Sequence, residues 1–416
     1  NMRRFSGSWI FIIIVLLIDL YVFQAVKLTV QTAAPKIKFT VYGLYWAVSL
    51  VVVLTLAVIP YINLDNWPKS FRTYWMATII GLFLSKALTV IFLVADELRR
   101  VLQWGGGKLF YQYIEGEPFK AAAISRSVFM SWLGLAIGGG LMTAMMVGFT
   151  NKYRYQLKKV KLNFPNLPDA FKGLKMVHIS DVHSGSFTDK KAVEHGVQMI
   201  MDQQADIILF TGDLVNDRAG EMAEYTDLFG RLRAPMGVYS TLGNHDYGDY
   251  KSWSSPEEKI QNLENLKQLQ ANMGWRLLIN EHVVLEKEGQ QIALLGIENW
   301  GAKANFPKYG KLHEAYAGTE KYPFKILMSH DPSHWDAQVR SEYSDIDLTL
   351  SGHTHGMQFG VELPGFKWSP VQYVYKQWAG LYEQAHQKLY INRGFGFIGY
   401  PGRVGILPEI TLIELA

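Results

Sequence analysis

The stretch Leu174-Lys-Met-Val-His-Ile-Ser-Asp-Val-His-Ser-Gly185 joins an apolar run to two side chains that can bind a metal ion. The apolar residues of 174–179 predict a buried strand. Asp181 and His183 follow where the chain should leave the sheet. Because residues two apart on an extended segment point to the same side, the carboxylate and the imidazole converge on one point. Both groups are common ligands of divalent metal ions, so this stretch predicts part of a metal site.

The same arrangement recurs at four places further along the chain. In each of them an apolar run typical of a strand is followed within a few residues by aspartate, asparagine or histidine. The runs and the groups after them are 205–211 with Gly212-Asp213, 237–242 with Gly243-Asn244-His245-Asp246, 324–328 with Ser329-His330-Asp331, and 347–350 with Ser351-Gly352-His353-Thr354-His355-Gly356. Open α/β sheets place their sites at the carboxyl ends of strands, so we expect the five groups to meet in one site.

In type and order these five groups resemble the signature of the calcineurin-like metallophosphoesterases. That signature reads Asp-x-His, Gly-Asp, Gly-Asn-His-Asp, His and Gly-His-x-His, and all five blocks are intact here. The resemblance covers residues 156–416 and implies an α/β fold, a four-layer α/β/β/α sandwich, with metal-dependent hydrolysis of a phosphoester. The apolar residues before it resemble the membrane half of bacterial membrane-bound members of the family.

The resemblance also assigns metal ligands, residue by residue. A first ion would take Asp181, His183, Asp213 and His355, and a second would take Asp213, Asn244, His330 and His353. Asp213 would bridge the two ions. Two divalent ions acidify a bridging water and clamp phosphoryl oxygens, so a metal-bridging hydroxide is the expected nucleophile. Amide, imidazole and carboxylate ligands suit borderline ions, and we expect manganese, with iron or zinc as alternatives.

His245 is expected to have a different role from the ligands. It directly follows Asn244, so it cannot easily point at the same metal ion. The family pattern places it near the leaving-group oxygen, as general acid or as a donor in the transition state. Asp246 is expected to orient its imidazole.

Four further residues near the predicted site have competing interpretations. His178 lies inside the first predicted strand, so we expect it to be packed or to support a ligand rather than to be catalytic. His334 supports the site, faces the substrate, or has no role there. Arg393 and Arg403 either meet the phosphate or are ordinary surface arginines.

The composition divides the chain into two parts. All eleven histidines of the 416 residues lie at His178 or later. We therefore predict a transmembrane region over residues 1–150 and a catalytic domain over residues 151–416. The formal net charge of +4 gives no reason to expect nucleic acid as a partner. The absence of cysteine excludes a disulfide and a thiol nucleophile.

Four apolar stretches are each close to the roughly 20 residues that cross the hydrocarbon core of a bilayer. They are residues 9–26, 39–62, 74–95 and 128–150. We predict four transmembrane helices. Asp19 and Lys86 lie within the first and third, and because charges inside a membrane usually pair, we expect an ion pair, with substrate handling as the alternative. The segment Asp96–Ser127 is expected to be a loop or an interfacial segment.

Four spans place both ends of the chain on one side of the membrane. The densest basic cluster, residues 152–161, follows the fourth span, and Arg3-Arg4 precedes the first. By the positive-inside rule we expect a bacterial inner-membrane protein with a cytoplasmic catalytic domain. Ser125-Arg126-Ser127 before an apolar run resembles a decayed twin-arginine export signal, which keeps the periplasmic side as the alternative.

The predicted catalytic domain contains further elements. We expect helices over 190–204 and 255–273, a hairpin around Gly289 and a closing strand over 409–415. Strands and helices that alternate in this way are typical of an α/β sandwich.

Three long aromatic segments lie between the ligand groups, at 247–256, 298–322 and 365–382. In this family, insertions near the metals form caps that select the substrate, and aromatic caps beside a bilayer favour an amphipathic or lipid-linked phosphoester. We therefore expect hydrolysis of a phosphodiester or pyrophosphate, similar to the nucleotide-sugar-lipid pyrophosphatases. The alternatives are a broad-specificity phosphodiesterase on soluble substrates and a non-catalytic metal-binding scaffold. The bilayer is the expected partner, and the sequence leaves the oligomeric state open.

Overall fold

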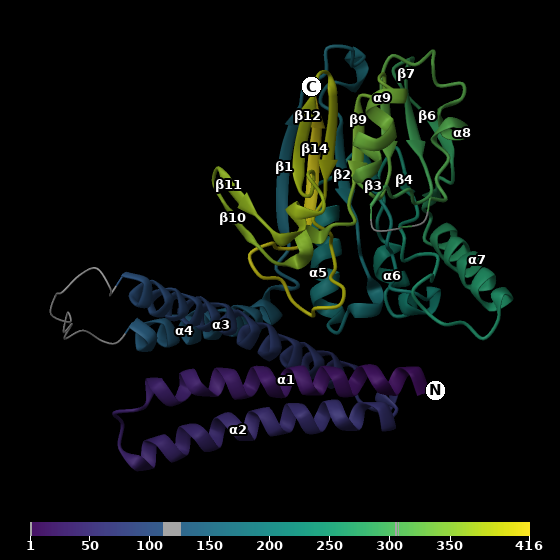
Figure 1. The fold of residues 1–416 in the computed structure, drawn as a ribbon. Coiled ribbons are helices and arrows are strands. Elements are labelled where there is room, and N and C mark those ends of the chain that lie inside the picture. The colour runs from purple at the N-terminus through teal and green to yellow at the C-terminus, as the bar shows by residue number, and fades with distance from the viewer. Residues whose placement is uncertain (1, 111–125, 304–305, 307) are drawn as a thin grey trace. The chain divides into compact units, whose positions relative to one another are not determined.

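The computed structural model describes residues 2–110, 126–303, 306 and 308–416, and it divides into two compact units, Asn1–Val147 and Gly148–Ala416 (Figure 1). The first unit is helical within its described residues. The second unit contains the sheets.

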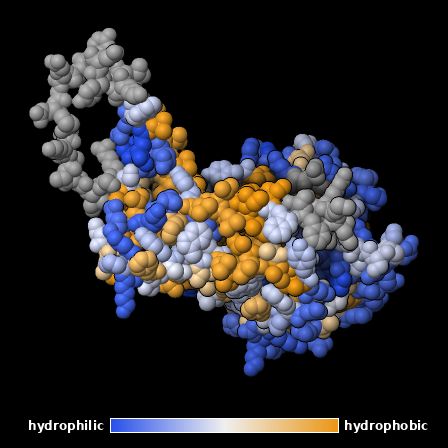
Figure 2. Space-filling model, turned by 60° about the horizontal axis from the view of Figure 1, so that its bottom comes forward, coloured by the Kyte–Doolittle hydropathy of each residue, from blue (hydrophilic) through white to orange (hydrophobic). Residues whose placement is uncertain are grey.

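The helical unit is built from long apolar helices. They are α1 (Met2–Thr29), α2 (Pro35–Val58), α3 (Lys69–Phe110) and α4 (Arg126–Asn151), the last of which ends in the second unit. All four are long and apolar enough to cross a membrane, over Trp9–Thr29, Pro35–Tyr61, Lys69–Trp104 and Ser127–Asn151. Large apolar side chains such as Ile13, Leu44 and Leu54 are exposed, as lipid-facing residues are, and Figure 2 shows a broad apolar surface where these helices come forward. The four predicted membrane helices are confirmed as helices.

The third helix is longer than predicted. The expectation of a loop from Asp96 is wrong up to Phe110, because α3 continues without a break for 42 residues. Charges on one turn of this extension satisfy each other, since Asp96 Oδ1 accepts from Arg99 Nε at 2.9 Å and from Nη2 at 2.6 Å. A polar face of this kind does not end a helix. The rest of the segment, residues 111–125, lies outside the described residues.

The predicted intramembrane ion pair is present. Lys86 Nζ lies 2.5 Å from Asp19 Oδ1 and 3.0 Å from the hydroxyl of Ser49, so three helices meet at this pair. Asp19 is fully buried. Apolar residues pack around the contact between α1, α2 and α3, among them Val15, Val52 and Ile79. The pair therefore neutralises two charges inside the bundle.

The first large sheet has the strand order β1-β14-β2-β3-β4-β5. Its strands are β1 (Gln156–Leu162), β14 (Glu409–Leu415), β2 (Lys175–Ile179), β3 (Ile207–Phe210), β4 (Val238–Ser240) and β5 (Arg276–Leu277). From β2 to β5 all neighbours are parallel. The carboxyl ends of β2, β3 and β4 therefore lie at one edge of this sheet.

The second large sheet has the order β12-β13-β9-β8-β7-β6. Its strands are β12 (Gly380–Gln384), β13 (Gln387–Ile391), β9 (Leu348–Ser351), β8 (Lys325–Met328), β7 (Gln290–Gly296) and β6 (Glu281–Lys287). The strands β7, β8, β9 and β13 are parallel. A separate two-stranded hairpin joins β10 (Val361–Leu363) to β11 (Phe366–Trp368).

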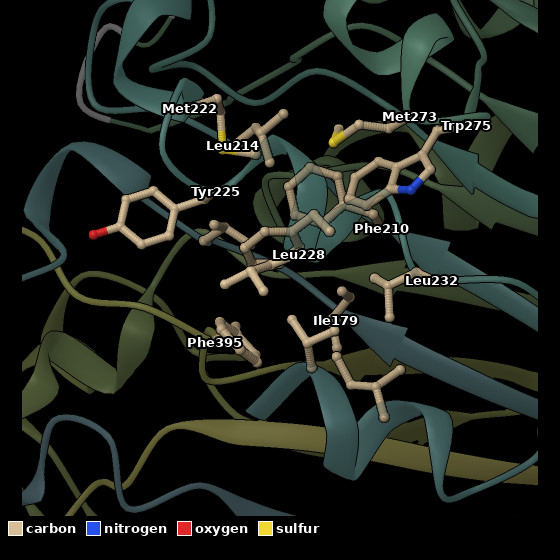
Figure 3. Close-up of a cluster of buried hydrophobic side chains, with 14 of the residues drawn as sticks. Ile179, Phe210, Leu214, Met222, Tyr225, Leu228, Leu232, Met273, Trp275 and Phe395 are labelled. Carbon is tan, nitrogen blue, oxygen red and sulfur yellow. The ribbon is translucent and has the colours of Figure 1, made fainter. Parts of the chain in front are cut away.

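Three apolar cores define the layers of this unit. One core lies between the sheets and combines Leu209 of the first with Leu294 and Leu350 of the second. Another covers the outer face of the first sheet, where Ile179, Phe210 and Leu228 pack with Trp275 and Phe395 (Figure 3). It involves α5 (Lys190–Met201), α6 (Thr226–Phe229) and α7 (Pro256–Asn272). The third lies under α8 (Leu312–Tyr316) and the turn Trp335–Val339, against the second sheet. The predicted four-layer α/β/β/α sandwich is confirmed.

The local sequence explains the elements predicted for this unit. Helix α5 begins after Asp189, whose carboxylate accepts a hydrogen bond from the Ala192 amide, and α7 begins after Ser255, which caps Glu258 in the same way. The hairpin β6–β7 turns at Glu288 and Gly289, both with positive φ. The helices over 190–204 and 255–273, this hairpin and the closing strand are thus confirmed, with boundaries shifted by no more than three residues.

Candidate metal centre

All seven predicted metal ligands lie at the carboxyl ends of five parallel strands. In the first sheet they follow β2, β3 and β4, and in the second sheet they follow β8 and β9. The ligands are Asp181 and His183 after β2, Asp213 after β3, Asn244 after β4, His330 after β8, and His353 and His355 after β9. Residues more than 170 positions apart thus meet, since the amide of His353 donates to the carboxylate of Asp181 at 2.9 Å.

The first cluster consists of Asp181, His183 and His355. One potential ligand atom from each lies within 4.8 Å of the others, and all three residues are buried. His355 Nε2 is 3.2 Å from Asp181 Oδ1, and His183 Nε2 is 3.9 Å from the same oxygen. A carboxylate and two imidazoles at this spacing can share one metal ion.

The second cluster consists of Asp213, His330 and His353, again with ligand atoms within 4.8 Å of one another. Asp213 Oδ2 is 3.2 Å from His330 Nε2 in this cluster. The same oxygen is 3.5 Å from His183 Nε2 in the first cluster. A single carboxylate oxygen therefore lies between the two clusters, as a ligand shared by two ions must.

Asn244 and His353 face each other at the second cluster. Asn244 donates its amide to the hydroxyl of Tyr250 at 2.9 Å, and its Oδ1 lies 2.8 Å from His353 Nδ1. Tyr375 lies 3.0 Å from His353 Nε2 and 3.3 Å from Asp331 Oδ2. In one tautomer of His353, Nδ1 donates to the Asn244 oxygen, and in the other the two atoms are both acceptors that can share a cation.

Other ring nitrogens of the centre are buried without a hydrogen-bond partner. They are both ring nitrogens of His183, together with Nε2 of His330 and Nε2 of His355. A buried polar atom without a partner costs about 1–3 kcal/mol, so four at one place need a ligand. Imidazole and carboxylate donors fit divalent cations, and the residues of both clusters fit the metals that the sequence predicts.

The backbone at the centre is held in an unusual conformation. Among the described residues, eleven other than glycine have positive φ, and five of them are predicted ligands. These are Asp181, His183, Asp213, His353 and His355, with φ between 47° and 69°. Left-handed backbone costs about 1–2 kcal/mol at such residues, and strain of this kind gathers at functional sites. The loops therefore keep a strained backbone conformation that orients the ligand side chains.

Electrostatics favour the protonation states that ligands need. Burial lowers the pKa of His183, His353 and His355, so these imidazoles are neutral. At His330 burial also lowers the pKa, but the carboxylates of Asp213 and Asp181 outweigh it and raise the pKa to about 10. In the absence of a metal ion the charge on His330 balances these carboxylates. A cation at this site would take over that balance, and His330 would then bind it in the neutral form.

His245 lies beside the clusters but belongs to neither. Its amide donates to Asp213 Oδ1 at 2.8 Å, and its ring Nδ1 donates to the carbonyl of Asn216 at 2.8 Å. Since Nδ1 carries the proton, Nε2 is left to interact with a substrate or water. The ring centroid is 5.0 Å from that of His183 and 4.6 Å from that of Tyr250.

Asp246 does not orient His245, which corrects the sequence-based expectation. Its carboxylate accepts hydrogen bonds from the amides of Gly243, Asp213 and Leu214 at 2.8–2.9 Å. Burial and the neighbouring Asp213 raise its pKa to about 7. The side chain ties the loop after β3 to the loop after β4, while the carbonyl of Asn216 orients the imidazole.

Comparison with known families matches both parts of the chain. The family described as calcineurin-like phosphoesterase matches residues 174–357, which include all seven predicted ligands and the five strand ends that carry them. The family described as probable calcineurin-like phosphoesterase, transmembrane domain, matches residues 2–152. The chain belongs to the calcineurin-like phosphoesterases. It is of the kind that carries four membrane helices before the phosphoesterase domain.

Three relatives illustrate the breadth of the similarity. A transmembrane protein with metallophosphoesterase domain from zebrafish (Danio rerio) is 29% identical over 265 residues, 62% of this chain and 56% of that protein. The uncharacterized metallophosphoesterase YkuE of Bacillus subtilis is 26% identical over 302 residues, 70% of this chain and 98% of that protein. Phosphodiesterase YaeI of Escherichia coli is 27% identical over 246 residues, 59% of this chain and 82% of that protein. The match therefore spans little more than half of the zebrafish relative.

The two arginines near this calcineurin-like centre do not face a phosphate. Arg393 is buried and pairs with Glu409 and, at 2.8 Å, with Glu362. Arg403 is fully buried and donates to backbone carbonyls, including that of Arg393 at 2.8 Å. Its Nη2 also lies 3.2 Å from His355 Nδ1. Both expectations for these residues are wrong, because neither side chain reaches the surface or the space between the clusters.

The two other histidines near the predicted site, His178 and His334, are packed. His178 is buried with its Nε2 2.9 Å from the hydroxyl of Thr211, which confirms the packed interpretation. His334 is buried between Ser329 and Gln338, and burial lowers its pKa to about 4. It supports the strand end that carries His330 and does not face a substrate.

The sequence-based reasoning missed two tyrosines at the centre. Tyr250 accepts from Asn244, and Tyr375 contacts His353 and Asp331. Tyr250 lies six residues after Asn244, within an aromatic segment, but a hydroxyl partner for an amide ligand leaves no signature of spacing. Tyr375 is 22 residues from His353 and is brought back by the fold.

Proposed function

We propose that this protein is a membrane-anchored, dinuclear metal-dependent phosphoesterase that hydrolyses a phosphodiester or pyrophosphate of a lipid-linked or amphipathic substrate. The observation that carries the proposal is the position of Asp213 Oδ2, 3.5 Å from His183 Nε2 and 3.2 Å from His330 Nε2. A single-ion site has no use for a carboxylate between two separate histidine clusters. Residues 1–150 form the membrane region and residues 151–416 the catalytic domain.

Two metal ions would be held by the ligands that the family pattern assigns. The first would take Asp181, His183, Asp213 and His355, and the second Asp213, Asn244, His330 and His353. When bound, the ions supply an activated water and neutralise charge on the phosphoryl oxygens. Manganese is the metal we propose, since amide, imidazole and carboxylate donors suit it, with iron and zinc as the other fits.

The chain's own residues position the substrate and handle the proton. His245 keeps Nε2 available because the Asn216 carbonyl accepts from Nδ1–H, so a ring protonated at both nitrogens can donate Nε2–H to the oxygen of the leaving group. Asp246 keeps the loops after β3 and β4 together through three backbone amides. Tyr250 holds the amide of Asn244 so that its oxygen is directed toward His353.

The first prediction tests whether the chain is an enzyme. The full chain in lipid nanodiscs is expected to hydrolyse bis-p-nitrophenyl phosphate, to lose this activity on chelation and to regain it with Mn²⁺, because the centre needs its cations. Metal analysis is expected to give about two ions per chain. Metal binding without turnover of any phosphoester would favour the scaffold alternative. Turnover of soluble diesters with no preference for lipid would favour the broad-specificity phosphodiesterase.

The second prediction concerns topology, for which we propose a bacterial inner-membrane protein with a cytoplasmic catalytic domain. The basic residues that follow α4 are expected to stay on the cytoplasmic side. A C-terminal green fluorescent protein fusion should be bright, and a C-terminal alkaline phosphatase fusion should be inactive. The opposite pair of results would place the catalytic domain in the periplasm.

A further inference from the structure

The hairpin β10–β11 has one apolar face and one polar face. Its register pairs Val361 with Trp368 and Leu363 with Phe366, and these four side chains share a face because they alternate with the Glu362–Lys367 pair. Leu363 and Phe366 are 61% and 56% exposed. The flanking residues Met357, Tyr373 and Val374 are exposed as well. Exposed apolar side chains that gather in this way mark an interaction surface.

The hairpin β10–β11 projects from the side of the sandwich (Figure 1), and contacts of its polar face fasten it there. Glu362 pairs with Arg393 at 2.8 Å and with Lys158 at 3.5 Å. Lys367 Nζ donates to the carbonyl of Ala379 at 2.6 Å and to the hydroxyl of Tyr382 at 3.1 Å. Because these contacts hold the polar side, the apolar face is directed away from the sandwich.

The segment that contains the hairpin begins and ends at the metal centre. It leaves the centre at His353 and His355 and returns at Tyr375, whose hydroxyl lies 3.0 Å from His353 Nε2. The apolar hairpin is thus the middle part of a long loop whose two ends meet at the predicted ligand His353. The hairpin is therefore joined to residues of the centre at both of its ends.

The base of the hairpin is bonded to a loop that holds the end of a membrane helix. The last turn of α4 belongs to the sandwich unit, and there the Arg403 amide donates to the Gly148 carbonyl at 3.0 Å. The next residue, Val404, exchanges backbone hydrogen bonds with Gln358 and Gly360, directly before β10, at 2.8 and 2.9 Å. A short run of bonded residues therefore connects Gly148, in the last turn of the candidate span, to the hairpin within the sandwich unit.

We propose that the apolar face of β10–β11 dips into the bilayer and that the lipid phosphoester at this membrane surface is the substrate presented to the metal centre. The occupant is a bilayer because the hairpin is tethered to the end of a membrane helix. Its apolar face also carries no charge, and Trp368 and Tyr373 suit the interface between headgroups and acyl chains. A second copy of the chain or a soluble partner is a competing occupant. The substrate part of this inference rests on the proposed phosphoesterase function, whereas membrane contact does not.

The third prediction is that a label at Leu363 senses lipid. The chain has no cysteine, so Leu363→Cys gives one site for an environment-sensitive nitrobenzoxadiazole label. In phosphatidylcholine–phosphatidylglycerol nanodiscs its emission should shift to the blue and be quenched by spin-labelled phosphatidylcholine. Ile260→Cys on α7, where the native side chain is 63% exposed, is the matched control and should be quenched far less. Equal quenching at both sites, or a blue shift at Leu363 that persists in detergent and depends on protein concentration, would overturn membrane contact.

The variant Leu363→Glu tests whether membrane contact of the hairpin is needed for hydrolysis of a lipid substrate. Two diesters with the same leaving group are compared, hexadecyl p-nitrophenyl phosphate in the nanodisc and soluble bis-p-nitrophenyl phosphate. Leu363→Glu should lower kcat/KM for the hexadecyl diester by about tenfold or more, because a charge replaces a leucine that is buried in the membrane. The value of kcat/KM for the soluble diester should stay nearly the same. Ile260→Glu should change kcat/KM for neither diester. An equal effect on both diesters would overturn the substrate inference. If the unmodified chain hydrolyses neither diester, the proposed function is contradicted. Membrane contact is then decided by the quenching result alone.

Discussion

Asp213→Asn is expected to abolish phosphodiester hydrolysis more completely than the loss of any single histidine ligand. Asparagine keeps Oδ1, which accepts from the His245 amide, and fits the same space. It replaces Oδ2, the atom between His183 and His330, with an amide nitrogen that cannot bind a cation. Without the bridge the two-metal clamp is lost, and several kcal/mol of transition-state stabilisation are lost as a result. The value of kcat/KM for bis-p-nitrophenyl phosphate should therefore fall by at least about 10³-fold.

Metal analysis of the same variant separates the bridge from an ordinary ligand. Asp213→Asn should lower the content of both ions, whereas His183→Asn should weaken one site and leave a measurable rate. Asp217→Asn is the matched control, because it makes the same change four residues later in the loop and outside both clusters. Near-normal metal content and rate in Asp213→Asn would end the dinuclear proposal.

The sequence predicted the fold and the meeting of the ligands because both depend on short-range patterns. Each ligand follows a strand that is apolar enough to be buried, and parallel strands bring their carboxyl ends to one edge. The positions of Asp181 and Asp213 therefore follow from strand ends alone. Their left-handed backbone does not, because φ at these residues is imposed by the assembled loops.

The errors concern side chains whose partners are far away in sequence or belong to the backbone. Asp246 stands next to His245, and that proximity predicted a contact, but the fold offers its carboxylate three buried amides that need an acceptor. Arg393 and Arg403 were expected near a phosphate or at the surface. Arg393 instead meets Glu362 and Glu409, and Arg403 meets carbonyls, in contacts that no local pattern marks. The long α3 was missed because a change in hydropathy ends a membrane span but does not end a helix.

His245→Ala is expected to retain both metal ions and to lose rate in a way that depends on the leaving group. The backbone amide that donates to Asp213 remains in alanine, and the ring belongs to neither cluster, so metal content should be unchanged. If His245 Nε2 protonates the leaving oxygen, kcat/KM for an alkyl phosphodiester should fall by the roughly 10²–10⁴-fold typical of lost general acid catalysis. For bis-p-nitrophenyl phosphate the fall should be much smaller, because nitrophenolate leaves without a proton.

His353→Ala provides the contrast that makes this result specific. It removes a predicted ligand whose Nδ1 faces Asn244, so metal affinity should drop and kcat/KM should fall for both diesters together. The deciding quantity is the ratio of kcat/KM for the two diesters in each variant, measured at saturating Mn²⁺ with metal content determined alongside. A ratio that changes in His245→Ala and not in His353→Ala assigns proton donation to His245. Loss of metal in His245→Ala, or equal loss on both diesters, would make His245 a ligand or a structural residue. The hydrogen bond from its Nδ1 to Asn216 would then only hold the loop.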